Sequence, residues 1–328
     1  MSIRTVYWLT LVIFFTACRK SNYIPTDQPV VSVVTPVSDS LYKWEEMGIV
    51  PGPYAQDIWF TSPAIGFTAG PQLYQTGDSG RTWNAIIGTT GASGFYNLFF
   101  TDSKNGFAEG SSQMAFTTDG GNTWKIKPLP SKGALTLFFI NSSTGFYGDN
   151  KGGDLYKTSD GGNTWTSSFK TSVTPDNYYP CFINNDTGFV ATSSGLFEST
   201  IDGGQNWKSL GTFSSIACAA NSYNQIQFLN KNEGFYGGPS GVLKTTDGGQ
   251  TWNNILPGRS GSVNVIKFFD SQSGFYKGST TIYHTWDGGQ TWAVSCKIGR
   301  GVFMGMNFPD AHTGWACTNN GRVFRIQQ

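Results

Sequence analysis

Charged residues are scarce in this chain: Asp, Glu, Lys and Arg make up only 13% of its 328 residues. No segment shows the sustained 3.6-residue hydrophobic period of a surface helix, so the sequence argues against a helical fold. Residues that favour strands and turns are plentiful instead, with 42 Gly, 25 Phe, 14 Tyr and 11 Trp. This composition predicts an all-β protein.

Histidine is rarer still, since the chain has only His284 and His312. Neither has a Cys or a carboxylate at the spacing of a metal site, so we expect no bound metal. No Gly-x-Gly-x-x-Gly motif stands between a strand and a helix, so we expect no nicotinamide or other cofactor. The 22 basic and 21 acidic residues nearly cancel, which leaves no electrostatic footprint for a nucleic-acid partner.

Long hydrophobic runs are missing apart from one near the amino end. The run from Thr5 to Ala17 has about 13 residues, whereas a membrane span needs about 20. It follows the positively charged Arg4, and this combination is typical of a secretory signal peptide. We therefore predict a signal peptide at residues 1–17 and an exported protein.

The signal peptide ends in a pattern that resembles a bacterial lipobox. The pattern is Phe-Thr-Ala-Cys at 15–18, with Phe15 where Leu is usual. We expect Cys18 to carry a lipid anchor that holds the protein to a membrane in the periplasm or at the cell surface. Residues 18–41 lack periodicity and would form a tether. The alternative is an ordinary secretory signal that happens to contain a Cys.

An element like Thr-Thr-Asp-Gly-Gly-Asn-Thr-Trp recurs six times, with 40 to 45 residues between successive Asp residues. We expect each Asp to accept backbone N–H groups across a tight turn, and each Trp to pack between repeats. A Ca²⁺ site would need several oxygen ligands, and each loop offers one carboxylate. The pairs are Asp78 and Trp83, Asp119 and Trp124, Asp160 and Trp165, Asp202 and Trp207, Asp247 and Trp252, and Asp287 and Trp292.

A second element recurs seven times: a Phe is followed six residues later by Gly and then by an aromatic residue. Each Phe is also followed, two residues later, by Asp, Asn or Ser, which suits a turn cap. Such constant spacing indicates a repeat architecture. The Phe and Gly residues are Phe60 and Gly66, Phe100 and Gly106, Phe139 and Gly145, Phe182 and Gly188, Phe228 and Gly234, Phe268 and Gly274, and Phe308 and Gly314.

Each repeat divides into four short strands separated by turn signals, which is the pattern of a β-propeller blade. The seventh unit ends before any Asp element, so it lacks a fourth strand. Trp44 stands at the fourth-strand spacing before the first Phe. We therefore predict a single seven-bladed propeller over residues 42–328, in which residues 42–49 complete the last blade in a three-plus-one closure.

The Asp element, for example Thr158 to Trp165, resembles the Asp box of the bacterial neuraminidase repeat. The chain also has Gly-Phe-x-x-Gly segments at 106–110 and 274–278. With both elements present, it more closely resembles the photosystem II stability and assembly factor-like propellers. The resemblance covers about residues 42–328 and is specific for the fold. The resemblance implies a helper role in assembly, but it is less specific for function than for the fold.

Enzymes that share the Asp box provide the main alternative. Sialidases clamp their substrate with three arginines, but no Arg-Ile-Pro motif opens this propeller. Xyloglucanases build their cleft between two propellers, whereas this chain holds one. The carboxylates outside the repeat positions are scattered over the blades, so we predict no catalytic residues. The scattered carboxylates include Asp57, Glu109, Asp149, Asp154, Asp176 and Asp186. A carbohydrate-binding or glycoside-cleaving protein stays the second interpretation.

Four cysteines follow Cys18, an even number that suits an exported protein. Pairs in neighbouring repeats would join Cys181 to Cys218 and Cys296 to Cys317. Free buried thiols are the alternative.

Propellers bind ligands where each fourth strand crosses to the next blade, because these loops vary while the blades are held. We expect a monomeric, non-catalytic module that binds an envelope protein or complex, or a glycan, on this face. Aromatic and charged residues there are the candidates, although each could be a solvated loop residue. They are Tyr54, Asp57, Tyr96, Asp176, Tyr178, Tyr179, Tyr223, Arg259 and Arg300.

Overall fold

The computed structural model describes residues 42–86, 88–89, 94–110, 112–130, 134–149, 153–170, 177–213, 226–238, 240–256, 263 and 265–327. Every regular element within these ranges is a β-strand. No helix among the described residues has the length and apolarity to cross a membrane. The predictions for Cys18, Asp176, Cys218, Tyr223 and Arg259 fall outside the described residues.

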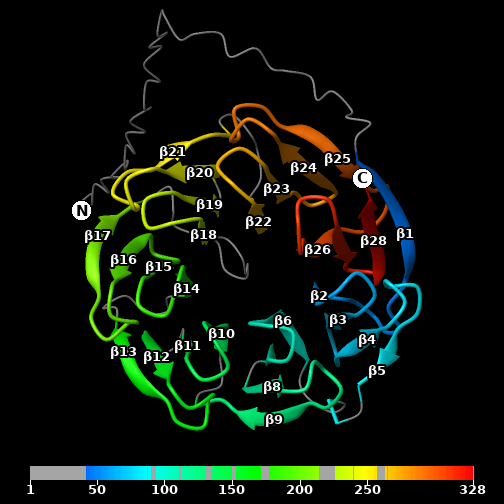
Figure 1. The fold of residues 1–328 in the computed structure, drawn as a ribbon, viewed down its shortest axis with the longest axis horizontal. Helices are drawn as coiled ribbons and strands as arrows, with labels where there is room; N and C mark the ends of the chain where they lie inside the picture. Colours follow the sequence, from blue (N-terminus) through cyan, green and yellow to red (C-terminus); the bar gives the residue numbers. More distant parts are fainter. Residues whose placement is uncertain are drawn as a thin grey trace, which may run out of the picture. The chain divides into compact units, whose positions relative to one another are not determined.

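The strands form seven four-stranded antiparallel sheets that stand as blades around a ring (Figure 1). The first three blades are β2 (Asp57–Phe60), β3 (Gly66–Ala69), β4 (Tyr74–Thr76) and β5 (Asn84–Ala85); β6 (Phe95–Phe100), β7 (Gly106–Gly110), β8 (Gln113–Thr117) and β9 (Lys125–Pro128); and β10 (Ala134–Phe139), β11 (Gly145–Asp149), β12 (Asp154–Thr158) and β13 (Thr166–Lys170).

The next three blades continue in the same order. They are β14 (Tyr178–Phe182), β15 (Gly188–Thr192), β16 (Leu196–Thr200) and β17 (Lys208–Thr212); β18 (Ile226–Phe228), β19 (Gly234–Gly238), β20 (Gly241–Thr245) and β21 (Asn253–Asn254); and β22 (Val265–Phe268), β23 (Gly274–Lys277), β24 (Thr281–Thr285) and β25 (Ala293–Lys297). Blade 7 contains β26 (Phe303–Asn307), β27 (Gly314–Thr318), β28 (Arg322–Gln327) and β1 (Lys43–Ile49).

The two ends of the chain meet in blade 7, which confirms the predicted three-plus-one closure. Strand β1 pairs antiparallel with β28, from Lys43 opposite Gln327 to Ile49 opposite Arg322, and the blue and red strands lie side by side in Figure 1. The Arg322 guanidinium also binds the Glu46 carboxylate through two hydrogen bonds of 2.8 and 2.5 Å. Because β1 covers the edge of β28, no open strand edge remains there.

The Phe and Gly of the second element have a shared packing role. In every blade the Gly lies against the ring of the Phe six residues earlier, and a Cβ added at the Gly would lie 2.3 to 2.8 Å from that ring. A larger residue would therefore displace the ring, which explains why both the Gly and the spacing recur.

Aromatic rings also join each blade to the next. The aromatic residue after each of these Gly residues packs on the Phe of the following blade, with ring centroids 3.5 to 4.9 Å apart. Trp315 of blade 7 stacks on Phe60 of blade 1, so the contact runs through all seven junctions. Such pairs stabilise the ring beyond the area that they bury.

The fourth-strand tryptophans pack edge-on against the same Phe residues. All seven contacts have centroid distances of 5.9 to 6.2 Å. In blade 7 the contact joins Phe308 to Trp44, which takes the place that the spacing predicted. The amino-terminal strand therefore replaces the missing fourth strand in packing as well as in pairing.

Each Asp element is a hydrogen-bonded turn. In the second, Asp119 Oδ1 accepts the Thr123 N–H at 2.9 Å and the Thr117 hydroxyl at 2.8 Å, and Oδ2 accepts the Thr123 hydroxyl at 2.6 Å. These bonds lower the pKa of Asp119 to about 2. Gly121 has a φ of 88°, and a Cβ there would lie 2.3 Å from Phe67 of the preceding blade. The turn therefore also fixes the distance between blades.

The predicted disulfide between Cys296 and Cys317 is wrong, because both are free thiols in the structure. Cys296 belongs to the core cluster between blades 6 and 7, and Cys317 to the cluster between blades 7 and 1. The sheet of blade 7 separates them. Cys181 is also a free thiol.

Candidate functional site

The inner wall of the ring is built from the first strand of each blade, which lies nearest the centre in Figure 1. In these strands the residue before the repeated Phe points to the opposite face of the sheet from that Phe, toward the next blade, and lies at the inner edge of the ring. Six of these seven residues are partly exposed. They are Trp59, Phe99, Phe138, Cys181, Gln227, Lys267 and Asn307.

Part of this wall is hollowed into a pocket of about 180 Å³. Its walls come from β18, β22, β26 and β2, which belong to blades 5, 6, 7 and 1. Trp59 and Met306 give it an apolar surface, and Gln227, Lys267 and Asn307 give it polar groups. Concave apolar sites with a few convergent polar groups are the usual form of ligand sites.

The two amide side chains of the pocket are committed to the scaffold. Gln227 Oε1 accepts the Phe268 N–H at 2.8 Å, and its Nε2 donates to the Phe268 carbonyl at 2.7 Å. Asn307 Oδ1 accepts the Phe60 N–H at 3.0 Å. Each amide therefore bridges the inner strands of two adjacent blades, and neither is free to bind a ligand through these atoms.

Lys267 is different, because no carboxylate among the described residues pairs with it. Burial lowers the pKa of its ammonium, and the neighbouring sulfur is that of Cys181. Burial also raises the pKa of that thiol to about 11, so it is neutral at pH 7 and offers no counter-charge. The pocket thus holds a partly desolvated cation without an anion, an arrangement suited to a ligand that carries a carboxylate.

Comparison with known proteins points to one group of propellers. Residues 180–327 match the family model described as photosynthesis system II assembly factor YCF48. A 170-residue segment is 29% identical to photosystem II assembly lipoprotein Ycf48 of Synechococcus sp. (strain CC9902), and covers 50% of this chain and 48% of that protein. The chain resembles Ycf48. The matched segment spans about half the length of this curated relative.

Solved structures show the same fold over nearly the whole propeller. The structure of YCF48 bound to D1 peptide aligns with a TM-score of 0.68 at 19% identity, over 89% of this chain and 99% of that one. Virginiamycin B lyase from Staphylococcus aureus aligns with a TM-score of 0.71 at 10% identity, over 88% and 99%. At such identities the similarity establishes the fold, which binding proteins related to Ycf48 and enzymes share.

Three of the residues predicted to bind a partner on the crossing loops are buried instead. Tyr178 and Tyr179 are 0% and 5% exposed, because β14 begins at Tyr178 and carries both rings into the core. The Tyr178 hydroxyl donates to the Gly153 carbonyl at 2.5 Å. Asp57 is buried as well, and its Oδ2 accepts the Leu98 N–H of the next blade at 3.0 Å. The prediction of an exposed binding role is wrong for all three.

Tyr54, Tyr96 and Arg300 remain at the surface, where the two tyrosines are partly exposed and Arg300 is exposed. The Tyr54 hydroxyl lies 3.9 Å from where a Cβ on Gly94 would be, so it is close to the start of the strand that holds Tyr96. None of the three lines the channel pocket. Trp59 and Lys267 were missed in the sequence, although their shared position before the repeated Phe could have identified them.

Several carboxylates considered for glycoside cleavage have structural partners, either in the next blade or within their own blade. Glu109 is fully buried, and its Oε2 accepts the Leu137 N–H of the next blade at 3.1 Å. Asp154 pairs with Lys170 at 3.1 Å. Among the described residues no three His, Cys, Asp or Glu side chains gather in a group that could hold a metal ion.

Burial gives stability a pH dependence that can be measured. It raises the pKa of Glu109 from 4.5 to about 8 and that of Asp57 to about 7. The folded state therefore holds protons on these two groups that the unfolded state releases, so their contribution to stability is highest below about pH 4 and falls as the pH rises to about 8. From pH 5 to 8 we expect Glu109 alone to contribute a loss of up to about 1.4 kcal/mol per pH unit.

Glu109→Gln keeps the acceptor for Leu137 but cannot ionise. Denaturant unfolding at pH 5 and pH 8 should therefore show a smaller decrease for this variant than for the wild-type protein. An identical pH dependence in both proteins would show that Glu109 is ionised in the folded state.

Proposed function

We propose that this protein is an exported, lipid-anchored propeller that binds a protein partner, and that a carboxylate of the partner seats on Lys267 in the channel pocket. The partner segment would be extended, with an acidic side chain or a free carboxyl end. The observation that carries this proposal is the partly buried Lys267 ammonium, which no described carboxylate neutralises.

The energetics favour such a ligand. Removing an ammonium from water is costly unless an anion and hydrogen bonds replace the lost hydration. A carboxylate supplied by a partner would make a charge-assisted hydrogen bond to Nζ, while Trp59 and Met306 would contact the apolar part of the segment. Binding would then be specific, because a neutral segment would leave the buried charge uncompensated.

Two findings about similar proteins agree with this proposal. The matched cyanobacterial relative is named a lipoprotein, which fits the lipobox and Cys18. A similar propeller has been solved with a peptide bound. A role as a protein-binding module of the cell envelope joins these findings to the pocket without requiring catalysis.

Lys267→Met tests the proposed contact, because it removes the charge and keeps most of the side-chain length. After crosslinking in native membranes, we expect the wild-type protein to recover a small set of envelope proteins by affinity purification. The amount of the main partner recovered with the variant should be lower by about tenfold or more, because removing one member of a buried charge pair weakens binding by at least this factor. Quantitative mass spectrometry of the crosslinked complexes measures the difference.

Lys125→Met is the matched control, because Lys125 is exposed, belongs to β9 of blade 2 and lies outside the channel pocket. It should recover partners like the wild type. Cys18→Ser tests the anchor, since this variant should move from the membrane to the soluble fraction. Equal recovery of every partner by wild type and Lys267→Met would refute the role of the pocket, and retention of Cys18→Ser on membranes would refute the anchor.

A further inference from the structure

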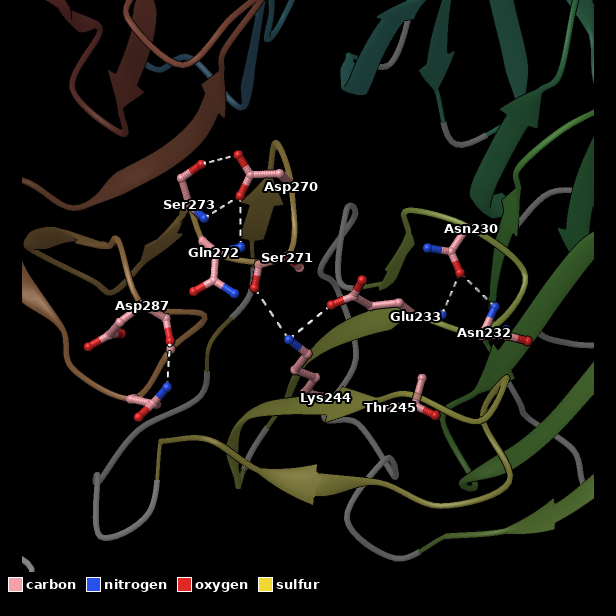
Figure 2. A network of polar contacts seen from close by, with 12 residues as sticks. Asn230, Asn232, Glu233, Lys244, Thr245, Asp270, Ser271, Gln272, Ser273 and Asp287 are labelled. Atoms are coloured by element: carbon pink, nitrogen blue, oxygen red, sulfur yellow. Dashed lines mark hydrogen bonds and ion pairs between the residues drawn. The ribbon is translucent and has the colours of Figure 1, made fainter.

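The junction between blades 5 and 6 is bridged by Lys244 (Figure 2). Its Nζ lies 2.9 Å from Glu233 Oε1 and donates to the Ser271 carbonyl of blade 6 at 3.3 Å. The same ammonium lies 5.1 Å from the centroid of the Phe235 ring. Carboxylate, carbonyl and aromatic face together form a site for one ammonium group.

Two other junctions also hold an ammonium beside the Asp element of the next blade. Between blades 2 and 3, Lys127 Nζ donates to the Gly161 carbonyl at 2.9 Å and lies 4.3 Å from the Phe116 ring centroid. Between blades 3 and 4, Lys157 Nζ lies 3.6 Å from where a Cβ on Gly203 would be. The turn of an Asp element and the neighbouring blade thus form a place that accepts a lysine.

The junction between blades 4 and 5 lacks this lysine. Ser199 pairs with Phe189 as Lys244 pairs with Phe235, and Thr187 takes the position of Glu233. A pocket of about 630 Å³ opens there, with Phe189 and Leu210 among its walls. The Lys231 carbonyl takes the position that the Ser271 carbonyl has in the next junction. No group in the described ranges donates a hydrogen bond to the Lys231 carbonyl.

The charges around this pocket include three carboxylates. Asp247 lines the pocket, while Asp186 and Asp202 are the chain neighbours of its lining residues Thr187 and Ile201. Hydrogen bonds lower the pKa values of Asp202 and Asp247, so both are ionised at neutral pH. Lys208 and Lys231 also lie at the pocket, but both are exposed and can turn their ammonium groups into solvent.

We infer that this pocket receives a lysine side chain of a protein partner. The ammonium of the partner's lysine would donate to the Lys231 carbonyl, and its side chain would lie over the Phe189 ring. Lys244 lies over the Phe235 ring in the same way, one blade further on. Ile201, which is 83% exposed at the rim, would contact the partner beside this lysine. The site shares no lining residue with the channel pocket, so it stands independently of the proposed role of Lys267.

The test uses N-acetyl-lysine-N-methylamide as the probe, with the backbone amides of Gly248 and Ile201 followed by NMR on the full propeller. A ligand of this size that fits its site binds with a Kd of about 1 mM. We expect saturable shifts at both amides. The norleucine analogue, which lacks the ammonium, and the glutamate analogue should each bind at least tenfold more weakly.

Two variants fill the pocket with residues that other blades already use. Thr187→Glu with Ser199→Lys recreates the pair of blade 5, and Ser199→Phe recreates the Phe116 of blade 2. Each should keep the wild-type melting temperature and weaken the lysine probe at least tenfold. The inference is overturned if no saturable shift occurs up to about 20 mM probe, if lysine and norleucine bind alike, if the glutamate probe binds more tightly, or if a folded filled variant binds as the wild type does.

Discussion

A chain that begins at residue 50 is expected to lose its stable monomeric fold. It lacks β1, so the edge of β28 is uncovered and the Glu46 to Arg322 ion pair is gone. It also lacks Trp44 against Phe308, a contact whose loss alone should cost about 3 kcal/mol or more. We expect the melting temperature to fall by more than about 10 °C and the exposed edge to promote association.

A chain that begins at residue 42 is the matched control, because it removes the signal peptide and tether but keeps β1. It should melt like the full mature protein and stay monomeric. Scanning calorimetry and size-exclusion chromatography with light scattering measure both properties. Equal melting temperatures and equal masses for the two truncated chains would mean that β1 does not close the ring.

Trp315→Ala is expected to destabilise the ring by about 3 to 5 kcal/mol. Trp315 is 0% exposed, its ring stacks on Phe60 with centroids 3.9 Å apart, and its indole N–H donates to the Ser79 carbonyl at 3.2 Å. The substitution therefore opens a cavity where blade 7 meets blade 1. Denaturant unfolding gives the change in the free energy of unfolding.

Trp315→Phe provides a test of the repeated stack itself, because the other six blades carry Phe at this position. It should keep the stack on Phe60 and retain most of the stability lost in Trp315→Ala. Ile201→Ala removes an exposed side chain and should change stability by less than about 0.5 kcal/mol. A Trp315→Ala protein as stable as Ile201→Ala would contradict the proposed importance of the stack.

The sequence predicted the number of blades and the position of the closing strand for a physical reason. Each repeated residue fills the same space in every blade: Gly274 packs under Phe268 as Gly66 packs under Phe60. Such spacing cannot drift without a clash, so it is visible as an exact repeat in the chain. Trp44 could be recognised for the same reason, because it occupies a position that every other blade also fills.

The binding residues could not be predicted in the same way. Tyr178 precedes a repeated Phe by four residues, and whether such a residue starts a strand or ends a loop depends on the length of a crossing that varies between blades. Asp57 looked like a free carboxylate because its partner, the Leu98 N–H, belongs to the next blade. A hydrogen bond from such a side chain to the backbone of another blade leaves no mark on the local sequence.

The importance of Lys267 could not be predicted from the sequence either. Its repeat position places it on the channel wall, but its importance depends on a missing counter-charge, and the neighbours that could supply one come from other blades. The pocket between blades 4 and 5 is easier to recognise once the fold is known. The repeats align residue by residue, so Ser199 can be compared directly with Lys244. The comparison shows that blade 4 lacks the lysine that fills this position in blade 5.

The most direct test of the central claim is a crystal structure of the propeller with the partner segment recovered by crosslinking. A carboxylate oxygen of that segment should lie within about 3 Å of Lys267 Nζ, the length of a charge-assisted hydrogen bond. A complex in which the partner binds on another face and leaves Lys267 without an anion would contradict the claim.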